Sequence, residues 1–222
     1  MTNLFNLAPP AYAIPQTWRL PEDDREYLHE QTWHLVLKGE SDPAVYVEQF
    51  GDELEDAGVS DAEATKYFES VVELRRAQQA GWPEFPSGNV EAAFAELAEI
   101  GVVARADFTC CGSCASAEIG DERDESRKWR GFLYFHTQDT DRLVYDCETY
   151  VGYGAFLDAH VDEAVWNAMS ESEQDHVYFE IVKQLMIAEV FPILEKHGLE
   201  VKWDQDLGTR ILLGNATYVV RI

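Results

Sequence analysis

Residues 102–114 have the sequence Val-Val-Ala-Arg-Ala-Asp-Phe-Thr-Cys-Cys-Gly-Ser-Cys, and this stretch decides the fold of the second half of the chain. The β-branched, alternating residues 102–109 predict a strand. A glycine turn follows, and residues 113–119 favour a short helix. A strand, a cysteine-rich turn and a helix are therefore expected in succession, with the other elements of this half arranged around them.

Five further segments have the composition of strands. They are residues 131–137, 147–154, 199–203, 210–213 and 217–221. The first is a nearly continuous apolar run, which is typical of a strand covered on both faces. Turn residues separate the last two, so these two are expected to form a hairpin.

Helical patterns occupy the rest of the second half. Asn89 is a candidate N-cap for a helix that ends at Gly101, and residues 138–146 predict a loop or a short helix. Residues 161–169 and 172–197 are expected to be helical. Pro192 should interrupt the second of these, because proline has no amide to donate to the carbonyl of Ala188.

The N-terminal part is predicted to be helical. Residues 1–20 contain three prolines and predict an extended arm, with Tyr12 and Trp18 docked on the body. Cap and periodicity signals predict three helices within residues 21–87. The sequence thus predicts an α+β protein: a helical N-terminal segment packed on an α+β domain, residues 88–222. Its mixed or antiparallel sheet should have about five or six strands flanked by helices.

The chain is strongly acidic. Its 42 acidic and 17 basic side chains give a formal net charge of −25, which repels nucleic-acid phosphates and anionic lipid. We therefore expect no direct nucleic-acid binding and no membrane binding, and a basic protein as the partner if the charge has a function. The sequence shows no long apolar run and no signal-peptide pattern, so we expect a cytoplasmic location.

The cysteine turn allows a redox dithiol. A thiolate at the start of a helix is stabilised by free backbone amides, and a Cys-x-x-Cys pair can close a disulfide across one turn. In this interpretation Cys111 is the exposed attacking sulfur and Cys114 the resolving one, while Cys110 faces the core. No proline-bearing strand matches the substrate clamp of thioredoxin-like enzymes.

The same turn allows a metal site. Zinc in a closed site needs about four ligands, and Cys110, Cys111 and Cys114 supply at most three. His136 or Cys147, at the ends of neighbouring predicted strands, could complete the set. Adjacent cysteines in extended backbone point to opposite faces, which argues against zinc. The structural alternative is that the cysteines are small buried hydrophobic residues under a glycine turn.

His136 and Asp139 belong to a second group of polar residues, at the end of an apolar predicted strand. Strand ends commonly carry ligand groups, and this pair could act as acid and base. The alternative is that Asp139 or Thr140 caps a helix while His136 bonds locally. No phosphate loop, dinucleotide fingerprint or nucleophile elbow is found in the sequence.

Three motifs in order carry a resemblance. They are FTCCGSC at residues 108–114, GFLYFHTQDT at 131–140 and GLEVKWD at 198–204, with Arg210-Ile211 following. Together they resemble a bacterial family known only as a domain of unknown function, over about residues 88–222. The resemblance implies that the cysteine turn and the His-Thr-Gln-Asp segment belong to one module, and it implies no activity.

Two hypotheses follow. The first is a non-enzymatic binding or regulatory protein with an acidic surface and a structural or redox-responsive cysteine turn. The second is a thiol-redox or zinc-binding protein that uses Cys110, Cys111 and Cys114, with His136 and Asp139 nearby. The sequence determines neither the ligand nor the oligomeric state.

Overall fold

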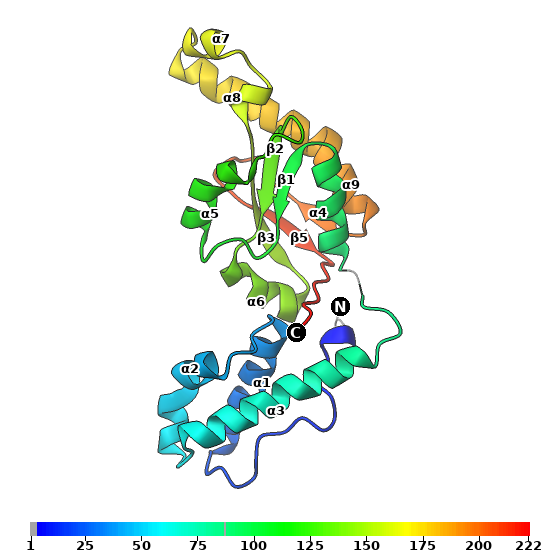
Figure 1. The fold of residues 1–222 in the computed structure, drawn as a ribbon. Helices are drawn as coiled ribbons and strands as arrows, with labels where there is room; N and C mark the ends of the chain where they lie inside the picture. The colour runs from blue at the N-terminus through cyan, green and yellow to red at the C-terminus, as the bar shows by residue number, and fades with distance from the viewer. Residues whose placement is uncertain (1–3, 87) are drawn as a thin grey trace. The chain divides into compact units, whose positions relative to one another are not determined.

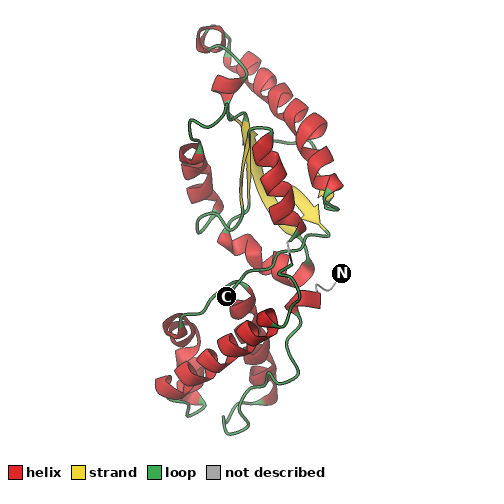
Figure 2. Cartoon of the chain, turned by 45° about the vertical axis from the view of Figure 1, so that its right-hand side comes forward, coloured by secondary structure: helices red, strands yellow, loops and turns green. Residues whose placement is uncertain are grey.

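The computed structural model describes residues 4–86 and 88–222. Two compact units are present, one made of residues 88–218 and the other of residues 4–86 together with 219–222. All strands lie in the first of these units, as the yellow arrows of Figure 2 show, and the second is helical. The predicted α+β class, with a helical N-terminal region followed by a mixed sheet, is confirmed.

The helical unit contains a 3₁₀ turn and three α-helices. Their bounds are Leu4–Asn6, α1 Glu22–Leu37, α2 Pro43–Asp56 and α3 Asp61–Ala80 (Figure 1). Local signals explain where they begin. The Asp42 side chain accepts a hydrogen bond from the Ala44 amide, and Ser60 and Glu63 form a capping box at the start of α3.

Of the predicted arm, residues 1–3 lie outside the described residues. Tyr12 and Trp18 are buried in the helical unit. The Tyr12 hydroxyl donates a hydrogen bond to the His29 carbonyl at 2.6 Å, and the Trp18 ring packs edge-on against Tyr67. None of the helices in the described parts of the chain is long and apolar enough to cross a membrane.

The end of the chain does not form the strand predicted for residues 217–221, and that prediction is wrong. Residues 219–222 pack on α3. The Gln79 side-chain amide donates to the Val220 carbonyl at 2.7 Å, and the Ile222 amide donates to the Gln79 side-chain oxygen at 3.1 Å. The backbone groups that a strand would use are thus bonded to a helix side chain.

The α+β unit begins with α4 Asn89–Glu99, β1 Val102–Arg105, α5 Gly112–Glu118 and a 3₁₀ turn, Ile119–Glu122. It continues with β2 Gly131–Tyr134, α6 Thr137–Asp146, β3 Thr149–Ala155 and a second 3₁₀ turn, Leu157–Ala159. The last part comprises α7 Glu163–Asn167, α8 Glu171–Leu185, a π-helical turn Met186–Val190, α9 Phe191–Lys196, β4 Glu200–Lys202 and β5 Ile211–Gly214.

Asn89 does not cap α4, contrary to the prediction. Gly88 occupies the N-cap position. The Asn89 side chain instead accepts from the Thr217 amide at 2.6 Å and donates to the Asn215 carbonyl at 2.8 Å. A long-range contact has replaced the local cap.

The expected interruption of the long C-terminal helix is confirmed. It takes the form of the π-helical turn, which lies immediately before α9, where Pro192 occupies the first turn. The missing proline amide explains why regular α-helical bonding stops there.

The sheet has five strands in the order β1-β2-β3-β5-β4. β1 and β2 are parallel, whereas β2 with β3, β3 with β5 and β5 with β4 are antiparallel. The C-terminal hairpin is therefore β4–β5, with Val201 paired with Leu213, and not the predicted pair 210–213 and 217–221.

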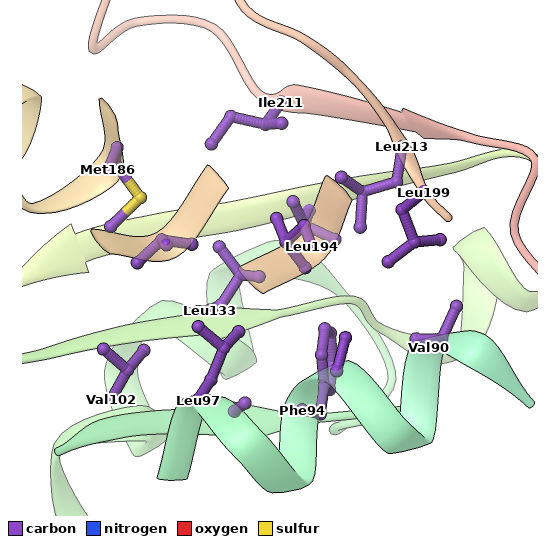
Figure 3. Close-up of a cluster of buried hydrophobic side chains, with 14 of the residues drawn as sticks. Val90, Phe94, Leu97, Val102, Leu133, Met186, Leu194, Leu199, Ile211 and Leu213 are labelled. Atoms are coloured by element: carbon purple, nitrogen blue, oxygen red, sulfur yellow. The ribbon is translucent and has the colours of Figure 1, made fainter. Parts of the chain in front are cut away.

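Helices cover both faces of this sheet. Leu133 and Phe135 face the larger core, whose side chains come from α4, the α8–α9 region and the strands (Figure 3). Phe132 and Tyr134 face the opposite side, with Val103, Ala115 and neighbouring residues. In Figure 1, α5 lies on this second side and α4 and α9 on the first. Alternation along β2 thus supplies two cores.

Candidate functional site: a cysteine turn at the edge of the sheet

The cysteine turn and the His136 segment lie at one edge of the sheet. The turn follows β1, and His136 follows β2 as the N-cap residue of α6. Because β1 and β2 are parallel, their C-terminal ends meet at the same edge. The register pairs Arg105 with Tyr134, so the two segments leave the sheet at the same level.

The predicted strand 102–109 ends early, at Arg105. Asp107 and Thr109 have positive φ angles of 50° and 61°, which a continuing strand does not allow. Hydrogen bonds to α6 hold this conformation: the Thr137 amide and hydroxyl both donate to the Thr109 carbonyl, at 3.2 and 2.9 Å. The Thr140 hydroxyl donates to the Asp107 carboxylate at 2.8 Å.

The turn therefore brings three sulfur atoms together. The Sγ atoms of Cys110, Cys111 and Cys114 all lie within 4.8 Å of one another, and those of Cys110 and Cys114 are 3.6 Å apart. Their side chains come from a turn and the first helical turn of α5, and no disulfide joins them. These three thiols could hold a metal ion.

Cys110 is exposed and Cys111 is half-buried. The prediction that Cys110 faces the core is wrong, and Cys111, predicted to be the exposed sulfur, is less exposed than Cys110. Side chains alternate between faces only in extended backbone, and the left-handed conformation of Thr109 breaks that alternation just before Cys110.

Two of the three thiols have shifted acidities in opposite directions. A backbone hydrogen bond from Cys114, followed by the thiols of Cys114 and Cys110, lowers the pKa of Cys111. Hydrogen bonding to the thiols of Cys110 and Cys111 raises the pKa of Cys114 to about 11. Of these two thiols, Cys111, the N-cap residue of α5, therefore loses its proton before Cys114 does.

Helix α5 is fixed to the sheet beneath the turn. Ala115 is completely buried, and the Ser116 hydroxyl lies 2.7 Å from the Tyr134 hydroxyl. Gly152 leaves room for the Tyr134 ring, because a Cβ there would lie 2.5 Å from the ring carbon that carries the hydroxyl. The position of Cys114 thus depends on packing that starts in β2 and β3.

His136 and Asp139 are both buried and contact each other. The His136 Nε2 atom lies 3.1 Å from the Asp139 carboxylate, which also accepts a bond from the His136 amide at 3.2 Å. The His136 ring is adjacent to the cysteine turn, since a Cβ placed on Gly112 would lie 3.6 Å from its Nε2 and Cδ2 atoms. His136, rather than Asp139 or Thr140, is the N-cap residue of α6, and Asp139 makes the capping-box contact with the His136 amide.

Arg210 completes this cluster, and our sequence interpretation did not include it. Both of its terminal nitrogens bond to Asp139, one of them at 3.0 Å, and one also donates to the Tyr150 carbonyl. Its Nη1 atom lies 3.5 Å from His136 Nε2. Arg210 directly precedes β5, which pairs with β3, so only the sheet register brings it here. The sequence signal for Arg210 was that Arg210-Ile211 follows the three motifs that carry the resemblance.

Two predicted ligands do not join the three sulfurs. His136 Nε2 faces Asp139 and Arg210, and His136 is not part of the group of metal-ligating atoms found in the described parts of the chain. Cys147 is buried at the C-terminal end of α6, whereas His136 lies at its N-terminal end. A ten-residue helix separates them by about 15 Å.

A groove with a volume of about 970 Å³ opens beside Arg210. Tyr150, Lys202 and Thr209 contribute to its walls. Arg210 therefore bonds to the buried Asp139 carboxylate while its side chain stays partly exposed at this groove.

Comparisons with known proteins give one finding. Neither curated proteins nor solved structures include a significant match to this chain. A family model described as "Domain of unknown function (DUF6891)" matches residues 21–222. The match begins at the first helix, so the family's domain includes the helical N-terminal part, which the resemblance over about residues 88–222 had left out. The chain is thus a member of the DUF6891 family.

Proposed function

We propose that this protein is a non-enzymatic binding protein that holds one thiophilic metal ion, of the zinc class, on Cys110, Cys111 and Cys114. The observation that carries the proposal is the convergence of the three sulfurs within 4.8 Å. Zinc–sulfur bonds of about 2.3 Å in tetrahedral geometry separate two sulfurs by about 3.8 Å. The 3.6 Å between Cys110 and Cys114 is already close to that value.

The chemistry of the donors supports the same ion class. Thiolates are soft ligands that select zinc and similar metals over magnesium or calcium. Each thiol must lose its proton to bind, and the lowered pKa of Cys111 supports the proposal because it favours the thiolate form of that residue. Reduced, accessible thiols suit the cytoplasm, which we propose as the location.

The acidic surface supports a further part of the proposal, a basic protein partner. A formal charge of −25 attracts positively charged surfaces and accelerates encounter with them at low salt. The same charge favours neither nucleic acid nor anionic membrane as a partner.

Metal binding is tested with reduced, metal-free protein titrated with zinc against a chromophoric chelator, with stoichiometry from native mass spectrometry. We expect one zinc per chain. C110S, C111S and C114S should each weaken zinc binding by at least about 100-fold. Loss of a residue that only hydrogen-bonds to a metal ligand already lowers metal affinity by about 10–100-fold. C147S is the matched control and should bind as the wild type does. Equal affinity in all four variants contradicts the proposal.

A second candidate function is a reversible dithiol switch in which Cys111 and Cys114 form a disulfide. The Cys-x-x-Cys spacing and the clustered sulfurs favour it. The Cys111 thiolate would attack a small disulfide such as oxidised glutathione, releasing one glutathione. Cys114, as thiolate, would then displace the second and close the protein disulfide.

Alkylation of the metal-free protein tests this candidate. Thiolate is the reactive form, so the lowered pKa of Cys111 means that it should react with iodoacetamide at a lower pH than Cys114. Cys114, with a pKa of about 11, should react appreciably only at the upper end of the pH range. Peptide mapping across pH 5–10 measures both, with C111S as control. Equal rates at Cys111 and Cys114 at every pH would exclude the switch.

A further inference from the structure

We infer that a metal ion on Cys110, Cys111 and Cys114 keeps a fourth coordination position open, and that this position takes a thiol from outside the chain. The inference rests on the proposed metal binding and adds the class of ligand that the bound ion accepts. Its basis is that three sulfurs converge, whereas His136, the nearest other candidate ligand, is bonded elsewhere.

No fourth ligand accompanies the sulfurs in residues 4–86 and 88–222. The group of histidine, cysteine and carboxylate atoms within reach of one ion contains the three thiols alone. A closed structural zinc site has four protein ligands, whereas a site that reacts or exchanges has three and an open position. The number of donors therefore places this turn in the open class.

His136 is the nearest alternative, and its contacts hold it away. Its Nε2 atom lies 3.1 Å from Asp139 and 3.5 Å from Arg210, and the Asp139 carboxylate is itself bonded by both terminal nitrogens of Arg210. If the ring rotated toward the sulfurs, Asp139 would lose its contact with His136 Nε2. The side chains of His136 and Asp139 are both about 90% buried. Loss of a bond at a buried charged group is costly, so His136 stays in place.

The sulfurs are accessible from solvent. Cys110 is exposed, and Cys111 and Cys114 are half-buried. The turn that carries them follows the C-terminal end of β1, and the exposure of Cys110 allows a small molecule to approach an ion held there. A soft ion that already has three thiolate ligands favours a fourth sulfur donor over an oxygen donor. On binding, the external thiol loses its proton to solvent, as each coordinating sulfur must.

Cobalt(II) provides the test, because its visible absorption reports both sulfur ligation and coordination geometry. Reduced full-length protein, kept reduced by a phosphine, is loaded with one cobalt and titrated with 2-mercaptoethanol. Ethylene glycol, which has the same size without sulfur, is the matched control. We expect the d–d bands to shift and to saturate at one thiol per protein, and ethylene glycol to leave them unchanged.

The possible outcomes are distinct. Absence of any sulfur-to-cobalt charge-transfer band means that the proposed metal binding itself fails. A normal charge-transfer band with d–d bands that 2-mercaptoethanol does not change means that the fourth position is closed, which overturns this inference alone. An identical response to both additives also overturns it, because the position would then not select sulfur.

The variant His136→Gln identifies the ligand if the position is closed. Under our inference H136Q and the wild type respond to 2-mercaptoethanol with the same saturation point. If His136 binds the ion as the fourth ligand, 2-mercaptoethanol changes the d–d bands of H136Q but not those of the wild type. That result contradicts the inference. The wild-type titration is decisive by itself should H136Q fold poorly.

Discussion

Arg210 connects the candidate site to the sheet because its guanidinium bonds to a carboxylate that is almost completely buried. Asp139 is 8% exposed and accepts from both terminal nitrogens of Arg210, while the Tyr150 carbonyl accepts from one of them. A buried carboxylate without its partner retains the cost of desolvation. The pair thus contributes to order at the N-terminus of α6, and through Thr137 to the cysteine turn.

Arg210→Gln should lower the free energy of unfolding by about 2 kcal/mol, because it removes charged hydrogen bonds from a buried carboxylate. Arg105→Gln is the matched control. Its pair with Glu122 is 36% exposed on each side, so we expect a loss below about 1 kcal/mol. Urea unfolding of the three proteins measures both effects. Equal losses in the two variants would contradict the role given to Arg210.

At the scale of elements, glycines in the sheet allow close approach of layers. Gly131 begins β2 opposite Ala155, and a Cβ there would lie 2.6 Å from the Gly154 carbonyl and 2.5 Å from a Leu185 methyl. The methyl can rotate away, but the carbonyl belongs to the paired strand β3 and can move only with it. The position thus couples β2, β3 and α8.

Gly131→Ala should therefore destabilise the α+β unit by about 1–3 kcal/mol, the usual cost of overpacking. Gly120→Ala is the matched control, since nothing lies within 4 Å of a Cβ at that position and its φ angle is not positive. Hydrogen exchange of the β2 and β3 amides should accelerate in G131A only. Unchanged protection in β2 and β3 would show that the layers adjust without strain.

At the scale of the whole molecule, charge repulsion opposes folding. The 42 acidic side chains exceed the 17 basic ones by 25, and most charged groups of both signs are at the surface. Salt shortens the range of this repulsion from about 30 Å at 0.01 M to about 10 Å at 0.1 M. Added salt should therefore favour the compact state over the expanded one.

The melting temperature should rise by a few degrees between about 0.01 M and 0.3 M sodium chloride. Repulsion between the acidic side chains is stronger in the folded chain than in the unfolded chain, so salt removes more of it from the folded state. Choline chloride at equal ionic strength is the control and should give the same rise. Differential scanning calorimetry with a chelator present measures it. A melting temperature that falls with salt would show that attractive ion pairs outweigh the net repulsion.

Most elements could be predicted because their signals are local. The capping box of Ser60 and Glu63 and the proline after Asp42 act within one turn, and the predicted helices beginning there are present. The predictions that failed depended on distant partners. Asn89 bonds to Thr217 instead of capping α4, and residues 217–221 do not pair as a strand, since residues 219–222 pack on α3.

The sequence by itself determined the α+β class, the acidic charge and the strand-turn-helix order that places three cysteines within five residues. Tertiary structure alone decided which way the sulfurs point and what surrounds them. The left-handed turn at Thr109 is held by Thr137 of α6, and it directs Cys110 outward to Cys114. Arg210 reaches Asp139 through the pairing of β5 with β3. Short-range spacing fixes which thiols are neighbours, whereas their orientation depends on hydrogen bonds between segments that are distant in sequence.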